Sequence, residues 1–186
     1  MNRKQLKLKK VNLISTIFFI LVAIFYLVHE KYFPPKQDIP DSLAEVVSVT
    51  DGDTLKVRIG NRQEKVRLIG VDTPEMAQKP WGGYARKYLE GLVSASGRRV
   101  KLEYDVEKRD KYGRLLAYVK TADGQFVNYL LVRDGYAVLF TVPPNVKYVE
   151  DLKSAQKEAR EKGLGIWSKN GLKERPVTYR KKHRRM

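Results

Sequence analysis

Alternating apolar and polar positions in the first half of the chain predict β-strands. TLKVRI (54–59) and KVRLIGV (65–71) interleave apolar with basic residues, which suits strands that have one buried face. The β-branched run AEVVSVT (44–50) precedes them. The separators are pairs that favour tight turns: Asp51-Gly52 and Gly60-Asn61. The pattern therefore predicts an antiparallel meander of three strands.

Two further strands and three helices are predicted after the meander. RVKLEYDV (99–106) and LLAYVK (115–120) read as strands, and apolar residues at helical spacing in ARKYLEGLV (85–93) predict a helix before them. Two more helices are expected at 127–135 and 145–163, each stopped by a glycine. Five strands with a helix between the third and fourth follow the order of the OB-fold, a barrel that binds oligonucleotides. The predicted fold class is α+β, a five-stranded OB-fold β-barrel with three helices.

An apolar segment near the N-terminus predicts one transmembrane helix in front of this barrel. VNLISTIFFILVAIFYLV (11–28) has 18 residues and no charge. At ~1.5 Å per residue such a helix just spans a hydrocarbon core of ~30 Å. A cleavable signal peptide is the alternative, but its apolar part is commonly about 7 to 15 residues and ends at a small-x-small site. Only Ala23 is available for such a site, so we expect an uncleaved anchor.

The charges on either side of the apolar segment predict its orientation. Residues 1–10 carry five basic side chains, whereas the stretch after the segment is nearly balanced. Basic residues favour the cytoplasmic side. We expect a cytoplasmic N-terminus (1–10), the anchor (11–28), a proline-containing stem (29–42), an extracellular domain (43–170) and a basic C-terminal tail (171–186).

Composition narrows the chemistry that the domain can perform. There is no cysteine, and the two histidines, His29 and His183, lie outside the patterned part of the chain. This argues against disulfides, thiolate nucleophiles, histidine-based zinc sites and Ser-His-Asp chemistry. The net charge of +16 suits an anionic partner, either nucleic acid or lipid headgroups. Carboxylates and arginines remain as the reactive groups.

Three short blocks carry these carboxylates and arginines: VTDGDT (49–54), RLIGVDTPE (67–75) and DKYGR (110–114). In these blocks the sequence resembles the staphylococcal nuclease (thermonuclease) family. The resemblance extends over residues 44–168, with GIW (165–167) matching the end of the last helix. Three blocks in the same order are far more specific than any one of them, and they imply the OB-fold as well.

The resemblance implies a Ca²⁺ site and a base. By similarity, Asp53 and Asp72 are direct Ca²⁺ ligands, together with the backbone carbonyl of Thr73 and water. Glu75 corresponds to the residue that activates the attacking water. Taken singly, each of these carboxylates reads as an ordinary turn, loop or surface residue. The set of them is what favours a site.

The resemblance also implies two phosphate-binding arginines, Arg67 and Arg114. A guanidinium suits this task because its planar donors match two phosphoryl oxygens at once. Strand alternation alone would place Arg67 and Asp72 on opposite faces of the sheet. Their convergence in one site therefore requires a bulge or a strand end near Gly70.

Substrate-binding residues are expected at Lys111, Tyr112 and Phe140. Lys111 and Tyr112 match positions that contact a terminal phosphate and the nucleotide, and aromatic stacking accepts any base. The family's paired tyrosines are not reproduced in AVLFTVPPN (137–145), where Phe140 is the only aromatic residue.

The tail TYRKKHRRM (178–186) has dense positive charge and no apolar pattern, so we expect it to be disordered. It could follow a phosphate backbone or lie on anionic lipid. The alternative is that it only improves solubility.

The resemblance implies a Ca²⁺-dependent nuclease that hydrolyses DNA, with RNA left open as a second substrate. Water attacks the phosphorus in line and leaves 3′-phosphate ends, and the protein is expected to act as a monomer at the cell membrane. The alternatives are a catalytically inactive nucleic-acid receptor of the same fold and a generic OB-fold strand-binding protein. Inactive members lose the acidic ligands or the arginines, and all five positions are present here.

Overall fold

The protein is described by a computed structural model, which covers residues 16–26 and 42–183. The chain divides into two compact units, Met1–Pro40 and Asp41–Met186. In the first unit, residues 16–26 form a helix whose large apolar side chains are exposed. No helix in the part of the chain that the structure describes is long and apolar enough to cross a membrane. The predicted anchor (11–28) extends outside the described residues at both ends and stays a prediction.

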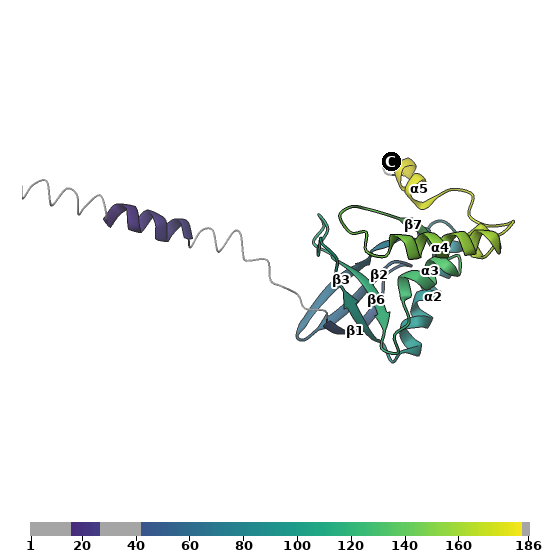
Figure 1. The fold of residues 1–186 in the computed structure, drawn as a ribbon, viewed down its shortest axis with the longest axis horizontal. Helices are drawn as coiled ribbons and strands as arrows, with labels where there is room; N and C mark the ends of the chain where they lie inside the picture. The colour runs from purple at the N-terminus through teal and green to yellow at the C-terminus, as the bar shows by residue number, and fades with distance from the viewer. Residues whose placement is uncertain (1–15, 27–41, 184–186) are drawn as a thin grey trace, which may run out of the picture. The chain divides into compact units, whose positions relative to one another are not determined.

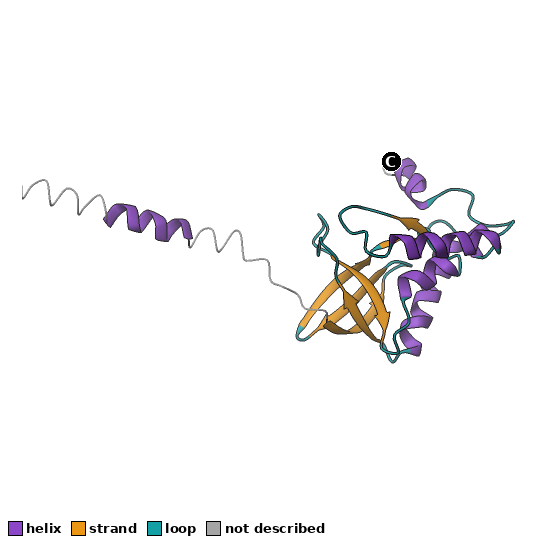
Figure 2. Cartoon of the chain, in the orientation of Figure 1, coloured by secondary structure: helices purple, strands orange, loops and turns teal. Residues whose placement is uncertain are grey.

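The second unit is built on a closed five-stranded barrel, as the strand pattern predicted (Figure 2). Around the barrel the strands lie in the order β1-β2-β3-β6-β5. All neighbours pair antiparallel except β3 and β6, which are parallel. Their bounds are β1 Ser42–Val49, β2 Thr54–Ile59, β3 Arg62–Leu68, β5 Arg99–Glu103 and β6 Leu115–Thr121. The predicted three-stranded meander is confirmed as β1, β2 and β3.

The predicted third strand (65–71) is wrong in one respect, because it divides at Ile69 into two strands. β3 ends at Leu68, and β4 (Gly70–Asp72) leaves the barrel to pair antiparallel with β7 (Val138–Phe140). Gly70 has φ = +78°, a conformation that a residue with a Cβ atom rarely adopts, so the chain can change direction here. The strand end expected near Gly70 is thereby confirmed.

The helices of the second unit gather on one side of the barrel (Figures 1 and 2). The three predicted helices are present, and a 3-10 turn and the helix α5 follow them. Their bounds are α2 Trp81–Ala95, α3 Val127–Arg133, α4 Val149–Glu161, η1 Gly165–Trp167 and α5 Pro176–His183. The tail was expected to be disordered, and this is wrong for residues 178–183, which belong to α5. Residues 184–186 lie outside the described part.

The core confirms the alternation read from the strands. Leu55 and Val57 of β2 and Val66 and Leu68 of β3 are buried, while the basic residues between them, Lys56 and Arg67, are partly buried. A buried amide joins the helices to the barrel. Asn128 of α3 accepts a hydrogen bond from the Val119 backbone and donates one to the Ile69 carbonyl. The point where β3 gives way to β4 is thus fixed to a helix.

Glu103 at the end of β5 collects three donors. Its carboxylate accepts hydrogen bonds from Lys147 at 2.6 Å and Tyr148 at 2.8 Å and pairs with Lys120 at 3.0 Å, and its side chain is 12% exposed. Burial would raise the pKa of Glu103, but the hydrogen bonds from Lys147, Lys120 and Tyr148 outweigh it and lower the pKa from 4.5 to about 2. The network holds Lys147 and Tyr148, the residues just before α4, against the barrel strand β5.

We expect Glu103→Gln to lower the free energy of unfolding at pH 7 by about 1 to 3 kcal/mol, because the two ammonium groups lose their shared carboxylate. A depressed carboxyl pKa stabilises the fold above pH 4.5, and this contribution is lost as the pH falls from 4.5 to about 2. Urea unfolding of both proteins across this range measures the difference. Glu150→Gln, at a side chain that is 83% exposed, is the control and should change little. A difference that stays constant down to pH 2 would contradict the assignment.

Candidate active site

The turn between β1 and β2 brings Asp53 against the segment that follows β4. The backbone N–H and the hydroxyl of Thr73 both donate to Asp53 Oδ2 at 2.9 Å. The turn is also held to the end of β3, since the Leu68 N–H donates to the Asp53 carbonyl at 3.0 Å. Asp72, the last residue of β4, is 0% exposed, and Asp53 is buried as well. Both predicted metal ligands and Thr73 therefore belong to one buried cluster.

Arg67 lies across this cluster. Its Nε is 3.2 Å from Asp53 Oδ1 and its Nη2 is 3.5 Å from Asp72 Oδ1, while Nη1 donates to the Leu68 carbonyl at 2.7 Å. Arg67 and Asp72 can meet because the strand ends between them and β4 turns back toward β7. The guanidinium is thus held by one backbone oxygen and two acidic side chains.

Glu75 sits in a short turn next to this cluster, and the side chain of Gln78 closes that turn. The Glu75 N–H donates to Gln78 Oε1 at 3.0 Å, and the Gln78 N–H donates to the Glu75 carbonyl at 2.8 Å. The Glu75 side chain is 39% exposed, in contrast to the fully buried Asp72. It is the carboxylate of the cluster that solvent can reach.

Helix α2 supports the turn through a close backbone contact. A Cβ atom on Gly82, in the first turn of α2, would lie 2.1 Å from the carbonyl oxygen of Glu75. Only glycine lets the helix approach the Glu75 backbone this closely. The packing of α2 against the Glu75 backbone therefore helps to fix the position of Glu75, in addition to the contacts of the Glu75 side chain.

Because the carboxylates of this cluster are buried, they need a positive charge nearby to stay ionised. Desolvation raises the pKa of Asp72, and the nearby guanidinium groups of Arg180 and Arg67 act against this rise. Burial likewise raises the pKa of Asp51, with a contribution from the charge of Asp53 two residues away. A buried carboxylate is costly in its ionised form unless a cation accompanies it. The cluster is therefore suited to hold a cation.

A residue that the sequence did not indicate supplies positive charge to this cluster. Arg180 of α5 reaches Asp72 with Nη1 at 2.9 Å from Oδ1 and Nη2 at 3.0 Å from Oδ2. Its Nη1 is also 2.8 Å from Glu75 Oε1. Burial would lower the pKa of Arg180, but the hydrogen bonds to Asp72 and Glu75 raise it above its usual value.

The donor set fits a hard cation. Asp53, Asp72 and the carbonyl of Thr73 offer only oxygen atoms, which Ca²⁺ and Mg²⁺ prefer. Within the described residues, no group of three or more histidine or acidic side chains gathers closely enough to hold a metal ion. Water would therefore have to complete the shell around two carboxylates. Glu75 is left for another role.

Arg114 and the residues before it form a second group at the start of β6. Arg114 pairs with Asp110, with Nη2 at 2.7 Å from Oδ2. Lys111 Nζ and Arg114 Cζ lie 5.2 and 5.6 Å from the centre of the Tyr112 ring, and Tyr112 is 61% exposed. Leu115 pairs with Val66 across the β3–β6 ladder. Arg114 thus directly precedes β6, one residue before the partner of Val66, while Arg67 itself pairs with Leu116.

Phe140 lies at the end of β7, where it pairs with Gly70 of β4. On the same ladder Val138 pairs with Asp72, so Phe140 is two positions along the sheet from the buried carboxylate. Its side chain is partly exposed. Phe140 is near the cluster, and its role in binding stays a prediction.

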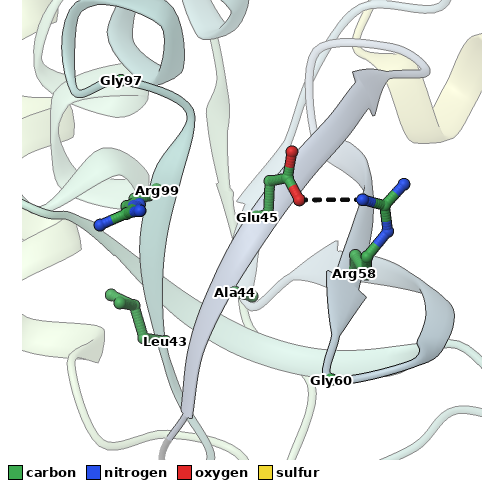
Figure 3. Close-up of a pocket in the computed structure, with 7 residues that line it drawn as sticks. All are labelled: Leu43, Ala44, Glu45, Arg58, Gly60, Gly97 and Arg99. Atoms are coloured by element: carbon green, nitrogen blue, oxygen red, sulfur yellow. Dashed lines mark hydrogen bonds and ion pairs between the residues drawn. The ribbon is translucent and has the colours of Figure 1, made fainter.

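A separate pocket of about 600 Å³ lies at the other end of β2 (Figure 3). It is formed by the start of β1, the β2–β3 turn and the start of β5, and Glu45 and Arg58 form an ion pair of 3.1 Å across it. None of the predicted site residues lines it. The chemistry suggested by the sequence is therefore found at the acidic cluster and not in this pocket.

The chain matches the model of the staphylococcal nuclease homologue family over residues 65–169. It is 40% identical over 158 residues to the thermonuclease of Staphylococcus intermedius, which covers 81% of this chain and 92% of that protein. It is 41% identical over 139 residues to the SPbeta prophage-derived endonuclease YokF and over 128 residues to endonuclease YncB, both of Bacillus subtilis (strain 168). These matches cover 68% and 65% of this chain and 46% and 59% of the Bacillus proteins. The chain thus spans about half the length of these two relatives.

The contact between α2 and the Glu75 turn can be tested with two adjacent glycines. We expect Gly82→Ala to lower the free energy of unfolding by about 1 to 3 kcal/mol, because the new methyl group collides with backbone that cannot yield easily. A Cβ atom on Gly83 would meet nothing within 4 Å, so Gly83→Ala should stabilise the helix by up to about 1 kcal/mol. Urea unfolding measures both. An equal gain from both substitutions would show that α2 does not press on the Glu75 turn.

Proposed function

Because the chain belongs to the staphylococcal nuclease family, we propose that it is a Ca²⁺-dependent nuclease that hydrolyses phosphodiester bonds of DNA. One observation carries the proposal. Arg67 contacts both Asp53 and Asp72 within a buried cluster, and the solvent-accessible Glu75 adjoins them. A binding module has no need for a buried acidic cluster beside arginines, since strand binding relies on basic grooves and aromatic stacking.

Asp53, Asp72 and the carbonyl of Thr73 would hold the Ca²⁺ ion. When bound, the ion would supply Lewis-acid stabilisation of charge on the phosphoryl oxygens. Arg67 carries five N–H donors in a fixed plane and can turn them from the two aspartates to a phosphate. Arg114, which directly precedes the neighbouring strand β6, would approach the same phosphate once it leaves Asp110. Both arginines then stabilise the charge that builds up in the transition state.

In this mechanism Glu75 is the general base. Its side chain is 39% exposed and lies at the edge of the cluster, where a water molecule can reach both the carboxylate and a bound phosphate. The Gln78 side chain and α2 hold the Glu75 backbone in place. We propose that this water gives its proton to Glu75 and attacks phosphorus in line, and that the bond to the 5′ oxygen breaks, which leaves 3′-phosphate and 5′-hydroxyl ends.

The nucleic-acid substrate would run over the surface of the barrel past Tyr112. The exposed ring of Tyr112 offers a stacking surface for a base, and the ammonium group of Lys111 above it offers a contact to phosphate. Phe140 is the corresponding aromatic residue on the side of β7. Stacking accepts any base, so we propose RNA as a second substrate beside DNA.

We also propose that the protein acts as a monomer held at the cell membrane by residues 11–28, with its nuclease domain outside the cell. The support for this anchor is the 18-residue uncharged segment and the five basic residues before it.

The experiment that tests the proposed function compares DNA cleavage with and without a calcium chelator in three variants. Asp53→Ala should weaken Ca²⁺ binding, so that added calcium recovers part of the activity. Glu75→Gln keeps shape and hydrogen bonding but removes the base, so turnover should fall by roughly 10²-fold or more without rescue by calcium. Glu158→Gln is the matched control, because its side chain is similarly exposed at 37% and lies on α4.

Cleavage that persists in chelator would overturn the calcium dependence. Activity of Glu75→Gln equal to that of the unchanged protein would overturn the role of Glu75. If the purified protein binds DNA without cutting it in any buffer, the domain is a nucleic-acid receptor and not an enzyme.

A second prediction concerns the geometry of Arg67. Arg67→Lys keeps the charge but loses the planar set of donors, and should cost about 2 to 4 kcal/mol of transition-state stabilisation. Turnover should fall more than substrate affinity, because the contact is strongest in the transition state. Arg58→Lys on the neighbouring strand β2, where the arginine pairs with Glu45, is the control. Steady-state kinetics on a defined oligonucleotide measure both, and equal turnover of the two variants would exclude a role for Arg67 in the chemical step.

A further inference from the structure

The guanidinium of Arg180 occupies the carboxylate oxygens that a metal ion would use. It binds Asp72 through two parallel contacts of 2.9 and 3.0 Å, one to each oxygen, and reaches Glu75 at 2.8 Å. A two-point contact of this kind between an arginine and a carboxylate is among the strongest and most directional polar interactions in proteins. Asp72 has no exposed surface, so its charge is satisfied from inside the molecule.

The segment that carries Arg180 is fixed beside the site by contacts of its own. Gln78, whose side chain closes the Glu75 turn, donates from Nε2 to the Glu174 carbonyl at 2.9 Å. Lys182 pairs with the Glu174 carboxylate at 2.6 Å, and Pro176 is buried. The start of α5 is thus tied to the same turn that positions Glu75. Arg180 does not reach the site as a single extended side chain from a remote segment.

Arg180 and a calcium ion compete for Asp72. Calcium binds carboxylate oxygens at about 2.3 to 2.6 Å, and each Asp72 oxygen already accepts a hydrogen bond from the Arg180 guanidinium. The two positive charges would also repel one another across a buried carboxylate, where screening by water is weak. Binding of one therefore weakens binding of the other.

We propose that Arg180 is an internal counter-ion of the active site, and that Ca²⁺ binds more tightly to molecules in which α5 has moved away from Asp72 and Glu75. The inference rests on the proposed function to the extent that Asp72 is a calcium ligand. Departure of Arg180 also frees Glu75, and it removes one of the two guanidinium groups that contact Asp72, Arg67 being the other. The C-terminal helix thereby sets the calcium concentration at which the site becomes active.

A direct measurement of calcium binding tests whether Arg180 competes with Ca²⁺, without any measurement of cleavage. Isothermal titration of the full chain with CaCl₂ should show tighter binding for Arg180→Ala than for the unchanged protein. A docked fraction of about nine-tenths corresponds to an apparent affinity lowered about tenfold, so the substitution should tighten binding by about that factor. Lys181→Ala removes the same charge from an exposed position of the same helix and should leave the affinity unchanged.

Hydrogen exchange supplies a second readout. In the unchanged protein, saturating Ca²⁺ should speed amide exchange across residues 176–183, because α5 loses its contact with the barrel. In Arg180→Ala these amides should exchange rapidly already without calcium. The calcium-induced rise in melting temperature should be larger in Arg180→Ala, because the vacated Asp72 then depends on the metal for its counter-charge.

The outcomes separate this inference from the proposed function. If the unchanged protein and Arg180→Ala bind calcium with equal affinity, or if exchange in α5 ignores calcium, Arg180 does not compete and the inference is wrong while the calcium site stands. If neither protein binds calcium but Arg180→Ala folds with the expected melting profile, the calcium site itself is wrong and the inference falls with it. If Lys181→Ala tightens binding as much as Arg180→Ala, a general charge effect replaces the specific contact.

Discussion

The carboxylate of Asp72 is wholly buried, and the rest of the site depends on this constraint. An ionised carboxylate without water requires positive partners and hydrogen-bond donors held at fixed positions. Arg67 and Arg180 provide the charge from two sides, one from a barrel strand and one from the C-terminal helix. Asp53, joined to Thr73 just after Asp72, adds a second acidic group to the same volume. The arrangement is an acidic centre enclosed by guanidinium groups, which favours the exchange of one cation for another.

Local pattern predicted most of the barrel, and long-range pairing accounts for what it missed. Alternation predicted β2, a β-branched run predicted β1, and further apolar runs predicted β5 and β6, all close to their observed bounds. The small sheet of β4 and β7 was not predicted. Two strands of three residues carry too few positions for a period, and they pair across more than sixty residues of sequence. The break at Ile69 could be expected only from the need to bring Arg67 and Asp72 together.

The structure brings part of the predicted residue set together, leaves Arg114 in a second group, and adds contacts that the sequence did not indicate. Asp53, Asp72 and Arg67 meet as the resemblance implied. Gln78 and Gly82 gave no signal, because a closing side chain and a close backbone approach depend on how α2 packs. Arg180 was hidden in a run of basic residues. Its helix is held by ion pairs and one buried proline, and such contacts leave no apolar period in the sequence.

The pairing of Asp72 with arginines separates folding from metal binding, two events that many metalloproteins combine. Small domains that rely on a metal to satisfy their acidic ligands fold only when the metal is present. In this protein the buried charge is already compensated by side chains of the same chain. The polypeptide can therefore complete its folding before any metal ion is bound, because Asp72 already has its counter-charge.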